Sequence, residues 1–137
     1  MSKAFSGGCA CAAIRYEISS EPVFMNHCQC LDCQRRSGTG HGSYLSFVDK
    51  KNVKLEGKPA QCEVVADSGN VKTRNFCPTC GAPLYISFKA MPQFLAVNAG
   101  SLDDPNRYKP HAVTYAMRGL AWDKLDPALQ SFAKMPG

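Results

Sequence analysis

The chain has 137 residues, of which 45% are hydrophobic and 20% are charged, and we expect one domain, residues 1–137, with a core of its own. No apolar run approaches the roughly 20 residues that span a bilayer, and Met1–Cys11 lacks the apolar core of a signal peptide. We therefore expect a cytoplasmic protein with no membrane partner. The formal net charge of +5 is the one feature that suggests a nucleic-acid partner.

Short strand-like segments dominate the chain. Apolar residues alternate with charged ones from Ile14 to Ile18, as in a strand with one buried face. Turn residues separate this segment from others of the same kind. The expected strands are residues 13–18, 43–48, 53–56, 61–66, 71–76, 84–88, 94–97 and 112–117.

Two short helices are expected among these strands. One runs from about Cys30 to Arg36. The other begins at Asp126, an N-cap residue followed by Pro127 at the first helical position, and continues to Lys134. Together the segments predict a mainly β fold of short antiparallel strands with one or two short helices.

Eight cysteines are the most informative feature of the composition. A reducing compartment keeps thiols free, so this number indicates metal binding or catalysis more than disulfides. Cys77 and Cys80 are three residues apart, with Pro78 to fix the turn and Gly81 to allow a positive φ after it. The strand-like segments on both sides predict a zinc knuckle at the tip of a hairpin.

A closed zinc site needs two more ligands than a knuckle supplies. Cys9 and Cys11 are candidates, because residues i and i+2 of a strand share a face. Gly7 and Gly8 just before them allow another backbone segment to approach closely.

Three further cysteines, Cys28, Cys30 and Cys33, lie within six residues of one another and are too close to seek separate partners. Structural zinc has four protein ligands, whereas catalytic zinc keeps a position for water or substrate. If the other four cysteines close one site, these three form a second site with a position open to a ligand. Seven zinc-bound thiolates and two zinc ions would lower the net charge to +2, so nucleic acid is no longer an expected partner.

Other ligand sets remain open at this point. Cys62 is the eighth cysteine and could close the second site, as could His27, His41 or His111. His27 could instead orient the ligand loop without binding the metal. In a zinc ribbon, the knuckle would pair with Cys30 and Cys33.

Four motifs together resemble the glutathione-dependent formaldehyde-activating enzyme family, which also includes centromere protein V. They are Gly-Gly-Cys-x-Cys at 7–11, Cys-x-Cys-x-x-Cys-x-Arg at 28–35, Phe-Cys-Pro-x-Cys-Gly at 76–81, and the late Pro-His at 110–111 with Trp122. They occur in order over nearly the whole chain. One departure is Gln29, where the family often has histidine.

The resemblance implies a β-tent zinc-binding fold with two zinc ions per chain. Cys9, Cys11, Cys77 and Cys80 match the ligands of the structural zinc, and Cys28, Cys30 and Cys33 match the active-site zinc and catalytic set. The implied activity is that of a carbon–sulfur lyase, similar to S-(hydroxymethyl)glutathione synthase, acting on glutathione with formaldehyde or a related aldehyde. The alternative is a non-enzymatic zinc module that binds a protein or nucleic acid.

Several other residues have weaker assignments. Arg35 and Arg36 could meet a substrate carboxylate, although a solvated surface position is equally compatible with the sequence. Tyr115 and Trp122 are expected in the core. The oligomeric state and the physiological thiol and aldehyde do not follow from the sequence.

Overall fold

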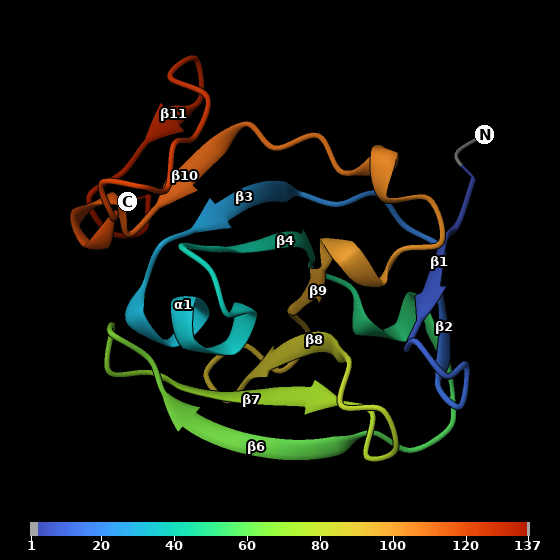
Figure 1. Cartoon of the computed structure of the whole chain (residues 1–137). Helices are drawn as coiled ribbons and strands as arrows, with labels where there is room; N and C mark the ends of the chain where they lie inside the picture. Colours follow the sequence, from blue (N-terminus) through green and yellow to red (C-terminus); the bar gives the residue numbers. More distant parts are fainter. Residues whose placement is uncertain (1–2, 137) are drawn as a thin grey trace.

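The computed structural model describes residues 3–136, so the first two residues and the last residue of the predicted domain 1–137 lie outside the described residues. Strands are the main regular secondary structure of the described chain (Figure 1), and within it no helix is long and apolar enough to cross a membrane. The strands are β1 (Phe5–Gly8), β2 (Arg15–Ile18), β3 (Phe24–Cys28), β4 (Gly42–Phe47), β5 (Val53–Glu56), β6 (Ala60–Val65), β7 (Val71–Phe76), β8 (Pro83–Phe88), β9 (Leu95–Asn98), β10 (Ala112–Thr114) and β11 (Gln130–Ser131). The helical elements are α1 (Leu31–Ser37) and the short 3-10 helices η1 (Lys50–Asn52), η2 (Ala99–Ser101), η3 (Pro105–Arg107) and η4 (Ala116–Arg118).

Between residues 3 and 136 the strands form two sheets. The larger has the order β11-β10-β3-β4-β9-β8-β7-β6, and the smaller has the order β1-β2-β5. Most pairs are antiparallel, but β10 runs parallel to both β3 and β11. The predicted mainly β fold with one or two short helices is confirmed.

Both faces of the large sheet are covered, because neighbouring residues on a strand point to opposite faces. Leu45 of β4 and Val97 of β9 belong to a core that also contains Phe47 and residues of β1 and β2. Tyr44 and Ala96, one step away on the same strands, belong to a second core. That second core contains Cys28, Cys30 and Cys33, so the predicted ligand loop is part of a packed interior.

The helix α1 begins one residue after Cys30, close to its predicted start. Cys30 is its N-cap, and its Sγ accepts a hydrogen bond of 3.3 Å from the backbone N–H of Cys33. The helix ends at Gly38, which has a left-handed φ of 75°.

The second predicted helix, from Asp126 to Lys134, is wrong. Asp126 Oδ1 accepts the N–H of Ala128 at 2.9 Å in a short turn, and the next residues form β11. The Gln130 N–H donates to the His111 carbonyl at 3.1 Å, and the Phe132 N–H donates to the Val113 carbonyl at 2.8 Å. These backbone groups pair with β10 instead of with a helix, so tertiary pairing overrides the local cap signal.

The expectation for the two late aromatic residues is half right. Tyr115 is buried at 8% exposure, whereas Trp122 is 63% exposed and lies outside the core. Tyr115 also has a left-handed φ of 54°, a conformation that a strand cannot continue through. This is why β10 ends at Thr114 and not at 117 as predicted.

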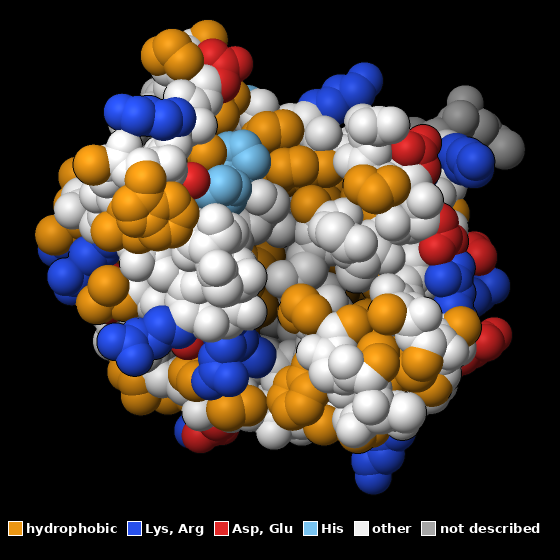
Figure 2. Space-filling model, in the orientation of Figure 1, with side chains coloured by type: hydrophobic (Ala, Val, Ile, Leu, Met, Phe, Trp, Pro, Cys, Tyr) orange, Lys and Arg blue, Asp and Glu red, His pale blue; other side chains and the backbone are white. Residues whose placement is uncertain are grey.

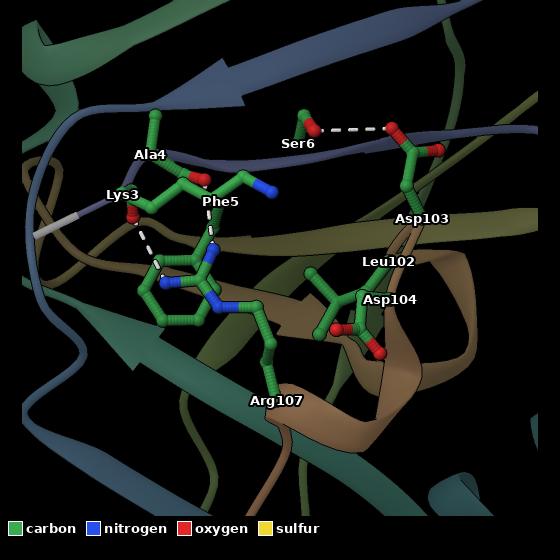
Figure 3. Close-up of a pocket in the computed structure, with 8 residues that line it drawn as sticks. All are labelled: Lys3, Ala4, Phe5, Ser6, Leu102, Asp103, Asp104 and Arg107. Carbon is green, nitrogen blue, oxygen red and sulfur yellow. Dashed lines mark hydrogen bonds between the residues drawn. The ribbon is translucent and has the colours of Figure 1, made fainter.

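Arg107 adds side-chain contacts to the start of β1, which also pairs with β2 (Figure 3). The Arg107 guanidinium lies over the ring of Phe5, 3.6 Å from its centroid, and donates to the carbonyls of Lys3 and Ala4. The small cavity beside these residues has a volume of about 50 Å³. Because Arg107 already donates to backbone carbonyls, we assign this cavity no ligand and regard the arginine as structural.

Candidate metal centres and the adjoining cavity

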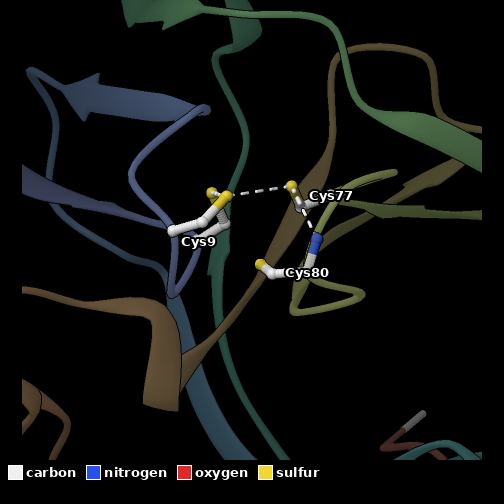
Figure 4. A group of neighbouring side chains, drawn as sticks. Cys9, Cys77 and Cys80 are labelled. Carbon is white, nitrogen blue, oxygen red and sulfur yellow. Dashed lines mark hydrogen bonds between the residues drawn. The ribbon is translucent and has the colours of Figure 1, made fainter.

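The first cysteine cluster joins the β1–β2 loop to the β7–β8 hairpin. The sulfurs of Cys9, Cys11, Cys77 and Cys80 all lie within 4.8 Å of one another, and Figure 4 shows those of Cys9, Cys77 and Cys80 pointing toward a common centre. Cys11 Sγ is 3.6 Å from Cys9 Sγ and 3.7 Å from Cys77 Sγ. Gly81 has a φ of 77° and donates its N–H to the Cys77 carbonyl at 2.8 Å. The predicted tight turn at a hairpin tip, with Cys77 and Cys80 on it, is confirmed.

Cys9 and Cys11, the other pair of this cluster, are positioned by a different local structure from the strand that was predicted. Cys9 and Cys11 lie in a turn after β1 and not on a strand, and Ala12 takes a left-handed φ of 65° to close it. The Ile14 N–H donates to Cys9 Sγ at 3.2 Å, a contact that stabilises a thiolate. A Cβ on Gly7 would lie 2.2 Å from the Ser101 carbonyl oxygen, so the predicted close backbone approach is confirmed.

The second cluster is made by the end of β3 and the start of α1. The sulfurs of Cys28, Cys30 and Cys33 lie within 4.8 Å of one another, and all three residues are buried. Among residues 3–136 no histidine, aspartate or glutamate joins this group. The structure therefore brings the seven predicted cysteines together as one set of four and one set of three.

Two buried cations and one carboxylate surround Cys33. Asp32 Oδ2 lies 3.0 Å from Lys72 Nζ and 2.7 Å from Arg74 Nη2. Both cations come from β7 and are only 6% exposed. Burial disfavours the Asp32 carboxylate, but the hydrogen bond from Arg74 and the charges of Arg74 and Lys72 outweigh it and lower the pKa of Asp32.

Of the three cysteines in the second cluster, Cys33 has the surroundings that most favour a thiolate. Hydrogen bonds from Cys28 and Cys30, assisted by the charge of Lys72 and the Tyr44 hydroxyl, lower the pKa of Cys33 to about 2 against the effect of burial. The Tyr44 hydroxyl donates to Cys33 Sγ at 3.1 Å. The same hydrogen bonds act in the opposite sense on Cys28 and raise its pKa. A cationic ligand is the natural means of making all three sulfurs thiolates.

The residues left open as further ligands lie elsewhere. His27 Nδ1 faces the Ser43 hydroxyl at 2.8 Å, and burial, with the neighbouring His41, lowers the pKa of His27 to about 4. The sulfur of Cys62 accepts from Arg36 Nη2 at 3.4 Å and belongs to neither cluster. The grouping of the cysteines also excludes the zinc-ribbon pairing.

The donor sets fit a metal ion. Thiolates select zinc, copper(I) or iron, and four or three sulfurs within 4.8 Å of one another suit a tetrahedral site. Lys72 and Arg74 carry two positive charges and share the single negative charge of Asp32. The remaining positive charge lies beside the three-sulfur set and suits a metal–thiolate centre that is negatively charged. Both clusters could hold a metal ion.

A cavity of about 760 Å³ adjoins the second cluster, and the face drawn in Figure 2 is hollowed near its middle. Two of its lining residues, Tyr44 and Arg74, also contact Cys33 Sγ. They connect the cavity with the second cluster. Of the two arginines proposed to meet a substrate, Arg36 lines this cavity, and both Arg35 and Arg36 are exposed.

One side of the cavity carries an imidazole in a fixed orientation. His41, a lining residue, has its Nδ1 3.0 Å from each carboxylate oxygen of Asp123. Asp123 also accepts from Gln29 Nε2 at 3.0 Å. Because the carboxylate accepts, Nδ1 carries the proton and Nε2 is the basic nitrogen. Sequence reasoning missed this pair, since 82 residues separate its members.

One known protein family matches most of this chain. The model of the glutathione-dependent formaldehyde-activating enzyme (GFA) family matches residues 4–118. The chain belongs to the GFA family. The resemblance inferred from the four motifs is thereby confirmed, and GFA membership supports a function related to glutathione and formaldehyde.

A solved structure supports the fold of this GFA chain. The crystal structure of a Rhodobacter sphaeroides protein matches with a TM-score of 0.60 and 19% sequence identity, covering 80% of this chain and 99% of that one. At this identity the likeness shows the fold alone. No curated protein sequence matches the chain with statistical significance.

Proposed function

We propose that the chain is a zinc-dependent carbon–sulfur lyase that joins a thiol, glutathione in the first instance, to formaldehyde or a related aldehyde, and reverses that step. Residues 1–137 would act as one domain holding two zinc ions. The first ion would be structural, and the second would belong to the active site. The assigned ligands are Cys9, Cys11, Cys77 and Cys80 for the structural ion and Cys28, Cys30 and Cys33 for the active-site ion.

The observation that carries this proposal is the unequal division of sulfurs in a member of the GFA family. Four thiolates complete a tetrahedral zinc site, whereas three leave a position for substrate. The three-sulfur set lies directly behind Tyr44 and Arg74, two lining residues that contact Cys33 Sγ. In the four-sulfur set Cys9 lines the cavity itself, but that set already has its four ligands. At about 760 Å³ the cavity falls within the roughly 300–1,000 Å³ typical of small-molecule sites.

The reaction forms one S–C bond and moves one proton. The thiol loses its proton, its sulfur bonds to the carbonyl carbon, and the carbonyl oxygen becomes a hydroxyl. Zinc in the second cluster would supply a low pKa for the substrate thiol. His41, held by Asp123, is the cavity residue that we assign to carry the proton from sulfur to oxygen.

Reduced cysteines are a condition of this chemistry. All eight cysteines of the chain are free thiols, and a cytoplasmic location, which the proposal includes, would keep them so. The alternative of a binding module for nucleic acid predicts a clustered basic face. On the face drawn in Figure 2 two groups of lysine or arginine side chains lie side by side at the lower left, and the others are spread around the edge, so no single large basic face is seen there.

The test is the rate at which formaldehyde exchanges between water and glutathione at equilibrium, measured by nuclear magnetic resonance exchange spectroscopy. Zinc-loaded wild-type protein should raise this rate above the spontaneous one. Cys30→Ser should abolish the increase while the far-ultraviolet circular dichroism is retained. Cys62→Ser is the matched control, because Cys62 belongs to neither cluster, and it should keep the wild-type rate.

An unchanged exchange rate with fully zinc-loaded wild-type protein, tried with formaldehyde and with larger aldehydes, would refute the proposal. Equal activity in Cys30→Ser and Cys62→Ser would refute the assignment of the second cluster.

A further inference from the structure

The charges next to the second cluster do not cancel within the protein. Lys72 and Arg74 both pair with the carboxylate of Asp32, and both are 6% exposed. A buried charge without a partner is costly. A third cation, Arg36, has its Nε 3.5 Å from Asp32 Oδ1, but its side chain is 42% exposed and screened by water. The buried part of the group, one carboxylate and two cations, therefore has one surplus positive charge beside Cys33.

A metal–thiolate centre supplies the missing negative charge. Three thiolates around a divalent ion carry one negative charge in total, which matches the surplus of the Asp32, Lys72 and Arg74 group. A fourth thiolate would add another negative charge to a site that is almost fully buried. A neutral fourth ligand would add no charge. The affinity for a thiolate should therefore depend on the nearby cations, and the affinity for a neutral ligand should not.

Arg74 is the cation placed to meet that added charge. Its Nη2 lies 3.5 Å from Cys33 Sγ, and the residue lines the cavity. Its Nε and Nη2 are engaged with Asp32 Oδ2 at 2.8 and 2.7 Å. Among residues 3–136 its Nη1 has one hydrogen-bond partner, the Tyr44 hydroxyl, at 3.4 Å. A guanidinium has five N–H donors, and Nη1 keeps donor capacity for a ligand in the cavity.

We propose that Arg74 makes the second cluster selective for an anionic sulfur ligand: its Nη1 contacts the substrate thiolate that enters from the cavity as the fourth metal ligand. The inference rests on the proposed function and names the residue that makes the site prefer an anionic ligand over a neutral one. Lys72 has the same charge, burial and strand, but it does not line the cavity. Arg36 does line it, yet its side chain is 42% exposed and therefore screened by water.

The experiment compares two fourth ligands on cobalt(II)-loaded protein at fixed pH. The probes are 2-mercaptoethanol, which binds as a thiolate and has no carboxylate, and imidazole, which binds neutral as in three-cysteine, one-histidine sites. Binding is followed by the cobalt absorption spectrum, which reports the sulfur-to-cobalt charge-transfer band. The variants are Arg74→Gln, Arg74→Lys and the control Arg35→Gln, which removes an exposed arginine of α1 that does not line the cavity.

Arg74→Gln should weaken 2-mercaptoethanol binding on the order of tenfold to a hundredfold, the range for a lost hydrogen bond to a charged group, and leave imidazole binding within about twofold. Arg74→Lys keeps the ion pair with Asp32 but lacks the fork needed to serve both partners. Its thiolate preference should fall as well, by a smaller factor. Arg35→Gln should bind both ligands as the wild type does.

The ratio of the two affinities decides the outcome. An equal loss of both ligands in the Arg74 variants, as a merely structural role would produce, overturns the inference, and so does an unchanged ratio. If Arg74→Gln does not hold two cobalt ions, the ratio in Arg74→Lys decides in the same way. Wild-type protein that binds imidazole but no thiol would instead overturn the proposed function, and with it the role of Arg74.

Discussion

Removal of the Asp32 carboxylate should destabilise the protein strongly, because it leaves two buried cations with too little negative charge. Asp32→Asn keeps the shape of the side chain but not its charge. The Asp32 side chain is 19% exposed, and those of Lys72 and Arg74 are each 7% exposed. The group therefore behaves as a mostly buried ion cluster.

The expected cost follows from that burial. Removing one partner of a buried ion pair costs about 3–5 kcal/mol, and the partial exposure of Asp32 places the loss near the lower end. A domain of this size loses roughly 3–5 °C in melting temperature per kcal/mol. Asp32→Asn should therefore melt about 10 °C below the wild type.

The assay is thermal unfolding of the zinc-loaded protein by circular dichroism, with Asp103→Asn as the control. Asp103 pairs with Arg15 at the surface, where the two side chains are 48% and 39% exposed. Such pairs contribute about 0–1 kcal/mol, so the control should melt within a few degrees of the wild type. Equal losses in the two variants would refute the account of a buried cluster.

The pH dependence gives a second check on the same residue. The pKa of Asp32 is lowered from an ordinary value of 3.8, so the unfolded chain binds its proton first as the pH falls. The stability from Asp32 is complete above the unfolded pKa and is lost as the pH falls through the folded pKa. The stability of Asp32→Asn should thus fall less steeply below about pH 4 than that of the wild type.

Three further predictions concern single positions. Cys77→Ser, at a fully buried ligand position, should remove the metal of the first cluster and lower the melting temperature sharply, as seen in unfolding scans with and without a chelator; a variant as stable as the wild type would contradict a structural site. Gly7→Ala should cost about 1–3 kcal/mol in denaturant unfolding, because its Cβ would clash with a backbone carbonyl, whereas Gly100→Ala, whose Cβ meets nothing within 4 Å, should cost little; equal costs would refute the close approach. Tyr44→Phe removes the hydroxyl that donates to Cys33 and should weaken metal binding at the second cluster by about tenfold in chelator competition; an unchanged affinity would show that this hydrogen bond does not support the thiolate.

The sequence was most informative where spacing alone decides the geometry. The knuckle at Cys77 and Cys80 needed only a tight turn between two strands, and β7 and β8 lie where they were predicted. The helix after Cys30 was also located within one residue. Local patterns of this kind do not depend on what packs against them.

The rest depended on tertiary contacts. Phe24–Cys28 was not expected as a strand, because its polar Asn26 and His27 break the apolar pattern; Asn26 is buried and donates to Thr114, 88 residues away. Within residues 126–134, which were expected to form a helix, Gln130–Ser131 pair with β10 instead. Neither partner is visible from the local sequence.

The sequence predicted no role for the charged residues of β7. Lys72 and Arg74, two apart on a strand, have the pattern of a solvent-facing edge. They are buried because Asp32 of α1 and the sulfur of Cys33 lie opposite them. Without knowing that α1 packs against β7, no sequence rule would have assigned these cations to the candidate site.

The most direct test of the account is the zinc content of single chains, counted by native mass spectrometry. Wild-type protein loaded under reducing conditions should carry two zinc ions, and Cys33→Ser should carry one, with the first cluster still filled. One zinc ion or none in the wild type, or the loss of both from Cys33→Ser, would contradict two separate centres built from four sulfurs and three.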